Sequence, residues 1–208
     1  MKKSLFTFLV FLSGIIAYAQ DAKDLLDKVK SKYQKASTYY IKFDLENGGK
    51  KFQGEVFSLK EKFNLNVMDI NQLYDGKKLY TISNDDKEVT ISNSRNTDDL
   101  LTPTKILNSY TNDYTYKLDK KQTIAGQPIQ YVRFTPKNNQ SSIQYALLGI
   151  NTNNNQIYQY KEVSKNNQTT SITVKEYLEN LIIHKSYFNF DSNKYKSKGY
   201  IAVSYTHL

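Results

Sequence analysis

The feature that most constrains the fold is a two-residue alternation of apolar and polar side chains. It begins at residue 38 and returns in short segments along most of the chain. In residues 62–68, for example, Phe63, Leu65 and Val67 alternate with Lys and Asn. Successive side chains of a strand point to opposite faces of the sheet, so this period predicts half-buried β-strands. The abundance of Tyr and Phe points the same way, because aromatic rings fit pleated surfaces.

About ten antiparallel strands are expected, separated by short turns rich in Asn, Gly and Asp. Segment 51–59 has apolar residues on both phases, which predicts a β-bulge there. Residues 186–190 are predicted as a last short strand. The ten main strands are predicted at 38–46, 51–59, 62–68, 79–83, 89–92, 113–118, 129–135, 143–150, 156–163 and 170–177.

Two segments have helical spacing instead. In 21–36, Leu26, Val29 and Tyr33 belong to one apolar stripe, and in 98–110 Pro103 suits the first turn of a short helix. The predicted fold class is therefore mainly β: an open or incomplete antiparallel β-barrel whose concave face is covered by an N-terminal helix and a mid-chain helix. Such a covered apolar face forms either an ordinary core or a cavity for a lipid-like ligand.

The first nineteen residues read as a signal peptide. Lys2 and Lys3 precede an apolar run at 5–16, and Ala17 and Ala19 are the small residues that a signal peptidase recognises, so cleavage is expected after Ala19. The chain is thus expected to be exported to the periplasm, with one domain at 20–202. Residues 203–208 look like translated non-native sequence and are left out of the functional interpretation.

Composition excludes several classes of site. The chain has no Cys and two His, so disulfides, thiolate zinc sites and cysteine nucleophiles are ruled out, and no metal or cofactor is expected. The formal charge of +9 comes from scattered basic residues, and export argues against nucleic acid as a partner. Asp85–Asp86 and Asp98–Asp99 fit turns and helix caps, and His184 has no evident triad partner. No catalytic residue is therefore predicted, and the protein is not expected to be an enzyme.

Several motifs occur in an order that is typical of one family. They are Gly54–Leu59 leading into Phe63–Leu65, Tyr74–Tyr80 with its Asp-Gly-Lys turn, Thr102–Leu107, Phe134–Lys137 and Phe188–Asp191. With this order, residues 21–200 resemble the periplasmic outer-membrane lipoprotein carrier family, LolA. The resemblance implies a monomeric carrier that accepts acylated lipoproteins from an inner-membrane lipoprotein-releasing transporter. It would shield their acyl chains and pass them to an outer-membrane acceptor. A carrier or sensor of another lipid or glycolipid on the same fold is the alternative.

The resemblance also implies site residues. Lys60 falls near a family arginine that latches the lid, but lysine lacks the planar fork of donors, and Glu61 stands where the family has proline. Lys60 is therefore only a possible lid latch. The predicted acyl-binding residues are Phe43, Phe57, Phe63, Leu65, Val67, Tyr80, Ile106 and Leu107.

Overall fold

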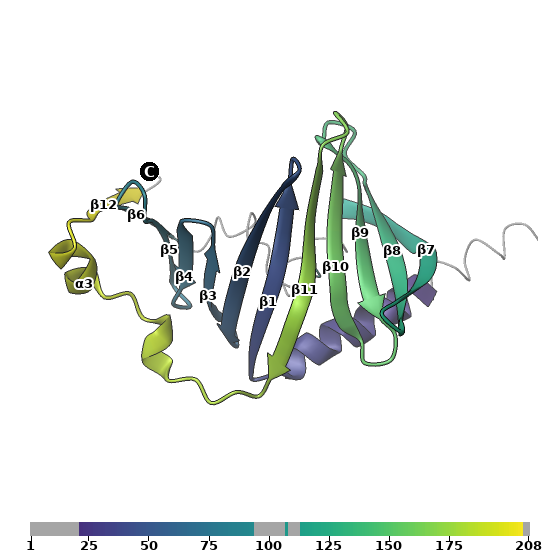
Figure 1. The fold of residues 1–208 in the computed structure, drawn as a ribbon, viewed down its shortest axis with the longest axis horizontal. Helices are drawn as coiled ribbons and strands as arrows, with labels where there is room; N and C mark the ends of the chain where they lie inside the picture. The colour runs from purple at the N-terminus through teal and green to yellow at the C-terminus, as the bar shows by residue number, and fades with distance from the viewer. Residues whose placement is uncertain (1–20, 94–106, 108–112, 206–208) are drawn as a thin grey trace, which may run out of the picture. The chain divides into compact units, whose positions relative to one another are not determined.

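The chain divides into two units in the computed structural model, which describes residues 21–93, 107 and 113–205 (Figure 1). The first unit takes in residues up to 33 and 102–171, and the second takes in 34–101 and 172–208. Strand β11 (Thr169–Glu179) begins in the first unit and ends in the second.

The first unit consists of a helix and the strand order β11-β10-β9-β8-β7. The helix spans residues 21–35, and the apolar stripe predicted from the sequence is buried at Leu26, Val29 and Tyr33. The hydroxyl of Tyr33 accepts a hydrogen bond from the backbone N–H of Ile157 (3.2 Å), which fixes the helix to β10. The strands are β7 (Tyr114–Ile124), β8 (Gln127–Pro136), β9 (Ile143–Asn151) and β10 (Gln156–Ser164).

Both faces of this unit's strands carry packed side chains. On one face Val132, Phe134 and Leu148 are completely buried. On the other, Ile129 and Tyr131 pack with Leu147. The apolar side chains of the first unit therefore largely pack against one another.

The second unit has the strand order β12-β6-β5-β4-β3-β2-β1-β11. All neighbours from β1 to β6 pair antiparallel, whereas β12 pairs with β6 in parallel. Since β12 and β7 each have only one neighbouring strand, the sheet is open, as the sequence predicts. The elements are β1 (Thr38–Asn47), β2 (Lys50–Leu59), β3 (Lys62–Val67), β4 (Ile70–Tyr74), β5 (Lys78–Ser83), β6 (Glu88–Asn93), the 3₁₀-helix η2 (Lys185–Phe188), α3 (Ser192–Ser197) and β12 (Ile201–Tyr205).

Three expectations about this unit are wrong in detail. The sequence analysis missed β4. The predicted bulge in 51–59 is absent, because β2 pairs with β1 and β3 without a register shift. Residues 186–190 do not form a strand: 185–188 are a 3₁₀-helix that buries Phe188. Apolar residues occupy both phases of β2 because both faces of this strand are covered. Val56 is buried on one face, and Phe57 contacts Tyr187 on the other.

Candidate functional site

Register divides the side chains of the second unit between two faces. Directly paired residues on neighbouring strands point to the same side of a sheet, and residues alternate along each strand. Face A is the side that carries Ile41 on β1, Val56 on β2 and Leu65 on β3, which pair in sequence. Face B is the opposite side, where Tyr40, Phe57 and Asn64 pair in the same way.

Face A is apolar across its first four strands. Three cross-strand rows can be followed through the register: Tyr39–Ser58–Phe63–Tyr74, Ile41–Val56–Leu65–Gln72 and Phe43–Gly54–Val67–Ile70. The members on β1 and β2 are buried, whereas Leu65, Val67 and Ile70 are only half-buried. The β3–β4 part of face A thus presents apolar side chains that keep part of their surface accessible.

Gly54 lets an aromatic ring lie flat on this face. It pairs with Phe43, and a Cβ at position 54 would come within 2.6 Å of Cε2 of that ring and 3.0 Å of the backbone oxygen of Asn66. Phe43 is nevertheless buried, so its ring occupies the space that a side chain at 54 would need. The absence of a side chain on β2 therefore sets the position of the ring beside Val67.

Gly54→Ala is expected to lower the free energy of unfolding by about 1–3 kcal/mol, because the added methyl group overpacks against Phe43. The double variant Gly54→Ala/Phe43→Leu should recover at least half of that loss, since leucine leaves the space free. Urea denaturation of the four proteins in a double-mutant cycle measures the coupling. Additive losses would show that the ring and the glycine are independent.

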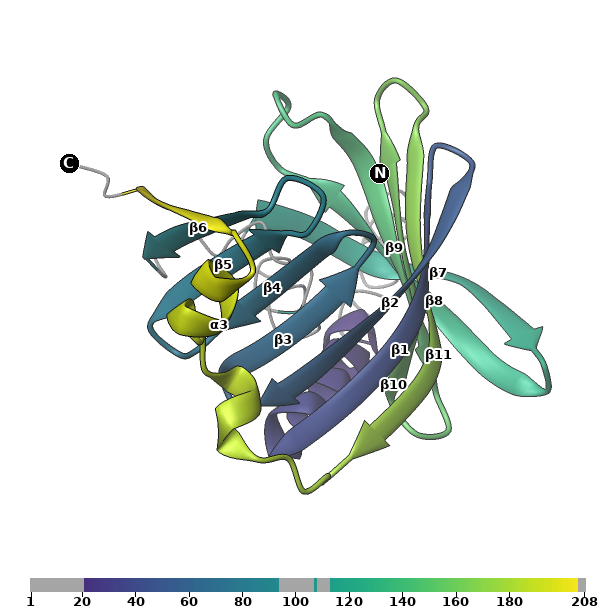
Figure 2. The same cartoon turned by 60° about the vertical axis from the view of Figure 1, so that its left-hand side comes forward.

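Face B is covered by the C-terminal segment of the chain. The ring of Phe57 meets Tyr187 at a centroid distance of 5.1 Å, and Tyr80 stacks on Phe190 at 4.3 Å. The side-chain amide of Asn64 donates to the backbone oxygen of Tyr187 (3.1 Å). Figure 2 shows η2 and α3 lying in front of β3, β4 and β5. Face B therefore receives a cover from its own chain.

The structure separates the predicted acyl-binding residues into two groups. Phe43, Phe63, Leu65 and Val67 share face A. Phe57 and Tyr80 do not join them, because register places them on face B.

One of the two predicted lid residues is among the described residues. Leu107 is helical and buried and belongs to the first unit, and Ile106 lies outside the described residues. Ile41, Val56 and Ile70 also lie on face A and were not predicted as site residues, although the alternation of 38–46 contains Ile41.

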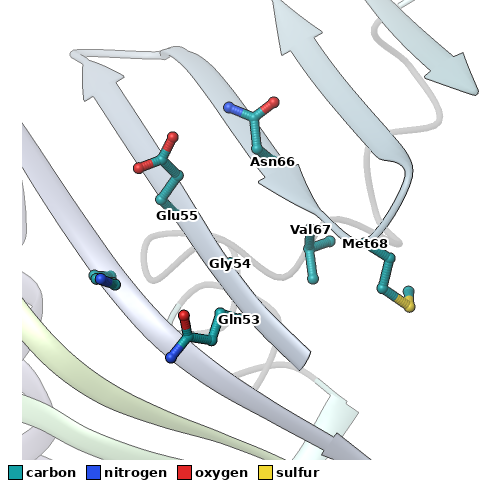
Figure 3. A pocket seen from close by; sticks show the side chains of 7 residues that line it. Gln53, Gly54, Glu55, Asn66, Val67 and Met68 are labelled. Atoms are coloured by element: carbon teal, nitrogen blue, oxygen red, sulfur yellow. The ribbon is translucent and has the colours of Figure 1, made fainter. Parts of the chain in front are cut away.

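A hollow of about 280 Å³ lies on β2 and β3, and its walls are about half polar and half apolar (Figure 3). Its lining includes Lys42, Glu55 and Asn66, which form a row on face B, together with Gly54 and Val67 of the neighbouring face A row. The hydroxyl of Tyr40 donates to the Glu55 carboxylate (3.2 Å), and burial together with that carboxylate raises the pKa of Tyr40. Charged and amide groups make this hollow unsuited to an alkyl chain. Within the described residues, no group of three or more His, Asp or Glu could hold a metal ion.

Lys60 occupies the turn between β2 and β3. Its backbone is left-handed (φ 55°), and its N–H donates to the backbone oxygen of Ser37 (3.1 Å). The hydroxyl of Ser58 donates to the backbone oxygens of Lys60 and Lys62 (3.3 and 3.2 Å). The turn is thus fixed through its backbone, while the side chain of Lys60 is exposed and borders a hollow of about 480 Å³. The lid helix predicted at 98–110, which Lys60 would latch, lies outside the described residues except for Leu107.

Lys60→Leu is expected to change the rate of acyl release in solution by about twofold or less, since one exposed ammonium group contributes little to a closed state. Stopped-flow displacement of a fluorescent fatty acid by unlabelled fatty acid, without membranes, measures the rate. Complete arrest of release in this variant would identify Lys60 as a true latch.

No protein-family model and no curated protein matches the chain. Solved structures do match. They include an uncharacterised conserved protein from Thermus thermophilus (TM-score 0.64, 9% identity, covering 89% of this chain and 99% of that one). MucB matches with a TM-score of 0.51 at 12% identity, covering 83% of this chain and 64% of that one. A LolA superfamily protein from Nitrosomonas europaea gives 0.40 at 13% identity, covering 81% and 97%.

Likenesses at these identities show the fold alone. The chain shares its fold with the Thermus thermophilus protein and with MucB.

Proposed function

We propose that this protein is a periplasmic carrier that binds the acyl chains of lipoproteins on face A of the second unit and moves them from the inner to the outer membrane. The observation that carries the proposal is the group of half-buried apolar side chains, Leu65, Val67 and Ile70, beside the Phe43 ring. Phe43, Phe63, Leu65 and Val67 are the proposed acyl contacts. Phe57 and Tyr80 are left out because the C-terminal segment packs on them.

The physical demand on such a site matches this face. An acyl chain offers only methylenes, each worth about 0.8 kcal/mol when buried, and needs no hydrogen-bonding partner. A carrier must also release its cargo, and residues that stay half-buried offer a surface that covers a chain without enclosing it completely. Removing one such contact should weaken the grip without destroying the fold.

The middle row of face A changes from apolar to polar, which suggests how cargo is oriented. The row Ile41–Val56–Leu65 continues into Gln72 and Thr81, which pair across β4 and β5. Amide and hydroxyl groups suit the amide and ester bonds where acyl chains join the lipoprotein. The alkyl chains are therefore assigned to the apolar residues of β1–β3 and to Ile70, and the linkage region to Gln72 and Thr81.

The periplasmic location rests on the signal peptide predicted from the sequence. None of the helices in the described part of the chain has the length and apolar content that a membrane crossing requires. The proposed partners are the inner-membrane transporter that loads the carrier and the outer-membrane acceptor that unloads it, with the carrier acting as a monomer.

Mass spectrometry of what copurifies with the protein from its native periplasm tests the proposal. Triacylated peptides or whole lipoproteins are the expected result. Free lipid, glycolipid or pigment without lipoprotein would instead make the protein a carrier or sensor of that molecule on the same fold. An empty protein that also fails to take up fatty acid in solution would mean that face A is ordinary core.

A further inference from the structure

One end of the second unit gathers lysines from three separate segments. Lys60 lies in the β2–β3 turn and Lys62 begins β3. Lys77 lies in the β4–β5 turn and Lys78 begins β5, while Lys185 begins η2. We call these five residues the basic end. A hollow of about 480 Å³ lies among them, lined by Leu59, Lys60, Glu61, Lys62, Gly76 and Lys185. The turns lie at one end of the strands, beside the end of β11 (Figure 1).

The neighbouring carboxylates are fewer than the lysines. Glu61 lines the hollow, and Glu179 ends β11, where it accepts a hydrogen bond from the Tyr177 hydroxyl (2.9 Å). Asp75 accepts hydrogen bonds from the backbone N–H groups of Lys77 and Lys78 (both 2.8 Å), so its carboxylate is committed to its own turn. Five lysines against three carboxylates leave this end positive.

An isolated apolar side chain projects beside the basic end. Ile182 is fully exposed, in the link between β11 and η2. The link is held in place by Thr38, whose backbone oxygen accepts from the N–H of Asn180 (2.8 Å) and whose hydroxyl donates to the oxygen of Leu181 (2.7 Å).

Hydrogen bonds also connect this part of the backbone to the turn that carries Lys60. Ser37, next to Thr38, accepts the N–H of Lys60, and Lys185 follows Ile182 by three residues. Ile182 is therefore fixed close to the basic end, and its exposure belongs to an ordered piece of backbone.

We propose that this end of the second unit docks on the surface of an anionic membrane, with Ile182 inserted at the acyl boundary and the basic end on the lipid phosphates. A lone projecting aliphatic group among long cationic side chains suits a bilayer interface, where the apolar tip enters the acyl layer and the ammonium groups stay with the headgroups. An acidic polypeptide segment would match the lysines but would leave the exposed Ile182 side chain in water. The inference does not rest on acyl binding at face A.

The expected strength is that of a transient contact. Each lysine near an anionic surface changes the partition coefficient about fivefold, and one inserted aliphatic side chain adds about tenfold. These factors fall with added salt, because the lysines are screened within a Debye length. Docking should therefore be reversible and confined to anionic membranes at moderate ionic strength.

The test uses the full chain, exported and purified from the periplasm of an expressing bacterium, with flotation on two kinds of vesicle. One contains phosphatidylglycerol and phosphatidylethanolamine, and the other contains only phosphatidylcholine. Three variants are compared: Lys62→Glu/Lys185→Glu, Ile182→Ser, and the matched control Lys50→Glu/Lys51→Glu, which changes the net charge by the same amount. The control pair lies at the start of β2, at the opposite end of that strand from the β2–β3 turn.

The anionic vesicles are expected to bind the unaltered protein in a salt-sensitive way. The lysine variant should lose binding at least about 25-fold, Ile182→Ser about tenfold, and the control about twofold or less. Equal binding to phosphatidylcholine, a control as weak as the lysine variant, or no effect of Ile182→Ser would overturn the proposal. Uptake of fluorescent fatty acid without membranes, measured on the same variants, should stay unchanged. A variant that loses fatty-acid uptake without membranes would be evidence about the acyl site on face A and would not test membrane docking.

Discussion

Replacing Leu65 by glutamate is expected to weaken acyl binding at least about hundredfold while the protein stays folded. A carboxylate at this position would have to leave water and lie against methylenes, and the cost of burying it exceeds what one chain contact returns, by about 3 kcal/mol. Leu65 is half-buried, so in the empty protein the new carboxylate can still reach solvent. Titration with a fluorescent fatty acid measures the affinity, and thermal unfolding followed by circular dichroism checks the fold.

A matched control separates the position of the charge from the charge itself. Gln53→Glu puts the same group on β2 of the same sheet, but Gln53 is exposed and neighbours Gly54 on the opposite face. Its affinity should stay within about twofold of the original. Leu65→Met, which keeps the volume and the apolar character, should also bind. Unchanged uptake by Leu65→Glu would remove face A from the proposal.

The alternation of 62–68 was enough to find β3, because one of its phases is wholly apolar and the other wholly polar. Strand β4 could not be found in this way, since Asn71 and Gln72 place amides on both phases. The amide of Asn71 bonds to the side-chain oxygens of Asn64 and Asn66 (both 2.6 Å). These cross-strand bonds satisfy groups that look like loop residues when they are read singly.

The face of each site residue depends on information that a single segment does not contain. Phe57 and Phe63 are both aromatic and come from neighbouring strands, yet the β2–β3 register places them on opposite faces. The sequence alone did not reveal that a segment more than a hundred residues later supplies Tyr187 to cover Phe57. Because β2 is buried on both faces, its sequence has apolar residues on both phases, and this pattern was interpreted as a bulge. Apolar residues on both phases of a strand are equally well explained by a second cover.

That second cover has a consequence for where cargo can bind. Asn64 looks like a solvent-facing residue in the alternation, but it is buried and its amide donates to Tyr187. Because the cover is held by a hydrogen bond to a buried side chain and by stacked rings, it belongs to the core of the second unit. The aromatic residues of face B thus already pack against the C-terminal segment. The apolar residues of face A on β3 and β4 are the ones that retain accessible surface.

Phe188→Ala is expected to show how strongly this cover supports the fold. Phe188 has 0% exposure in η2, which packs on β3, and its ring meets Tyr187 at 5.7 Å. Truncating a fully buried phenylalanine removes its transfer free energy and leaves a cavity, so the free energy of unfolding should fall by about 3–5 kcal/mol. Urea denaturation followed by far-ultraviolet circular dichroism measures the loss.

The neighbour Tyr187 provides the comparison, because its side chain is 40% exposed. Tyr187→Ala removes a ring of similar size from the same segment and should cost clearly less than Phe188→Ala. At a temperature where Phe188→Ala is still folded, its affinity for fatty acid should match that of the original protein, because Phe188 belongs to the cover of face B. A loss below about 1 kcal/mol would show that η2 is held only loosely. Face B would then be open to ligand, and Phe57 and Tyr80 would return as candidates for acyl contact.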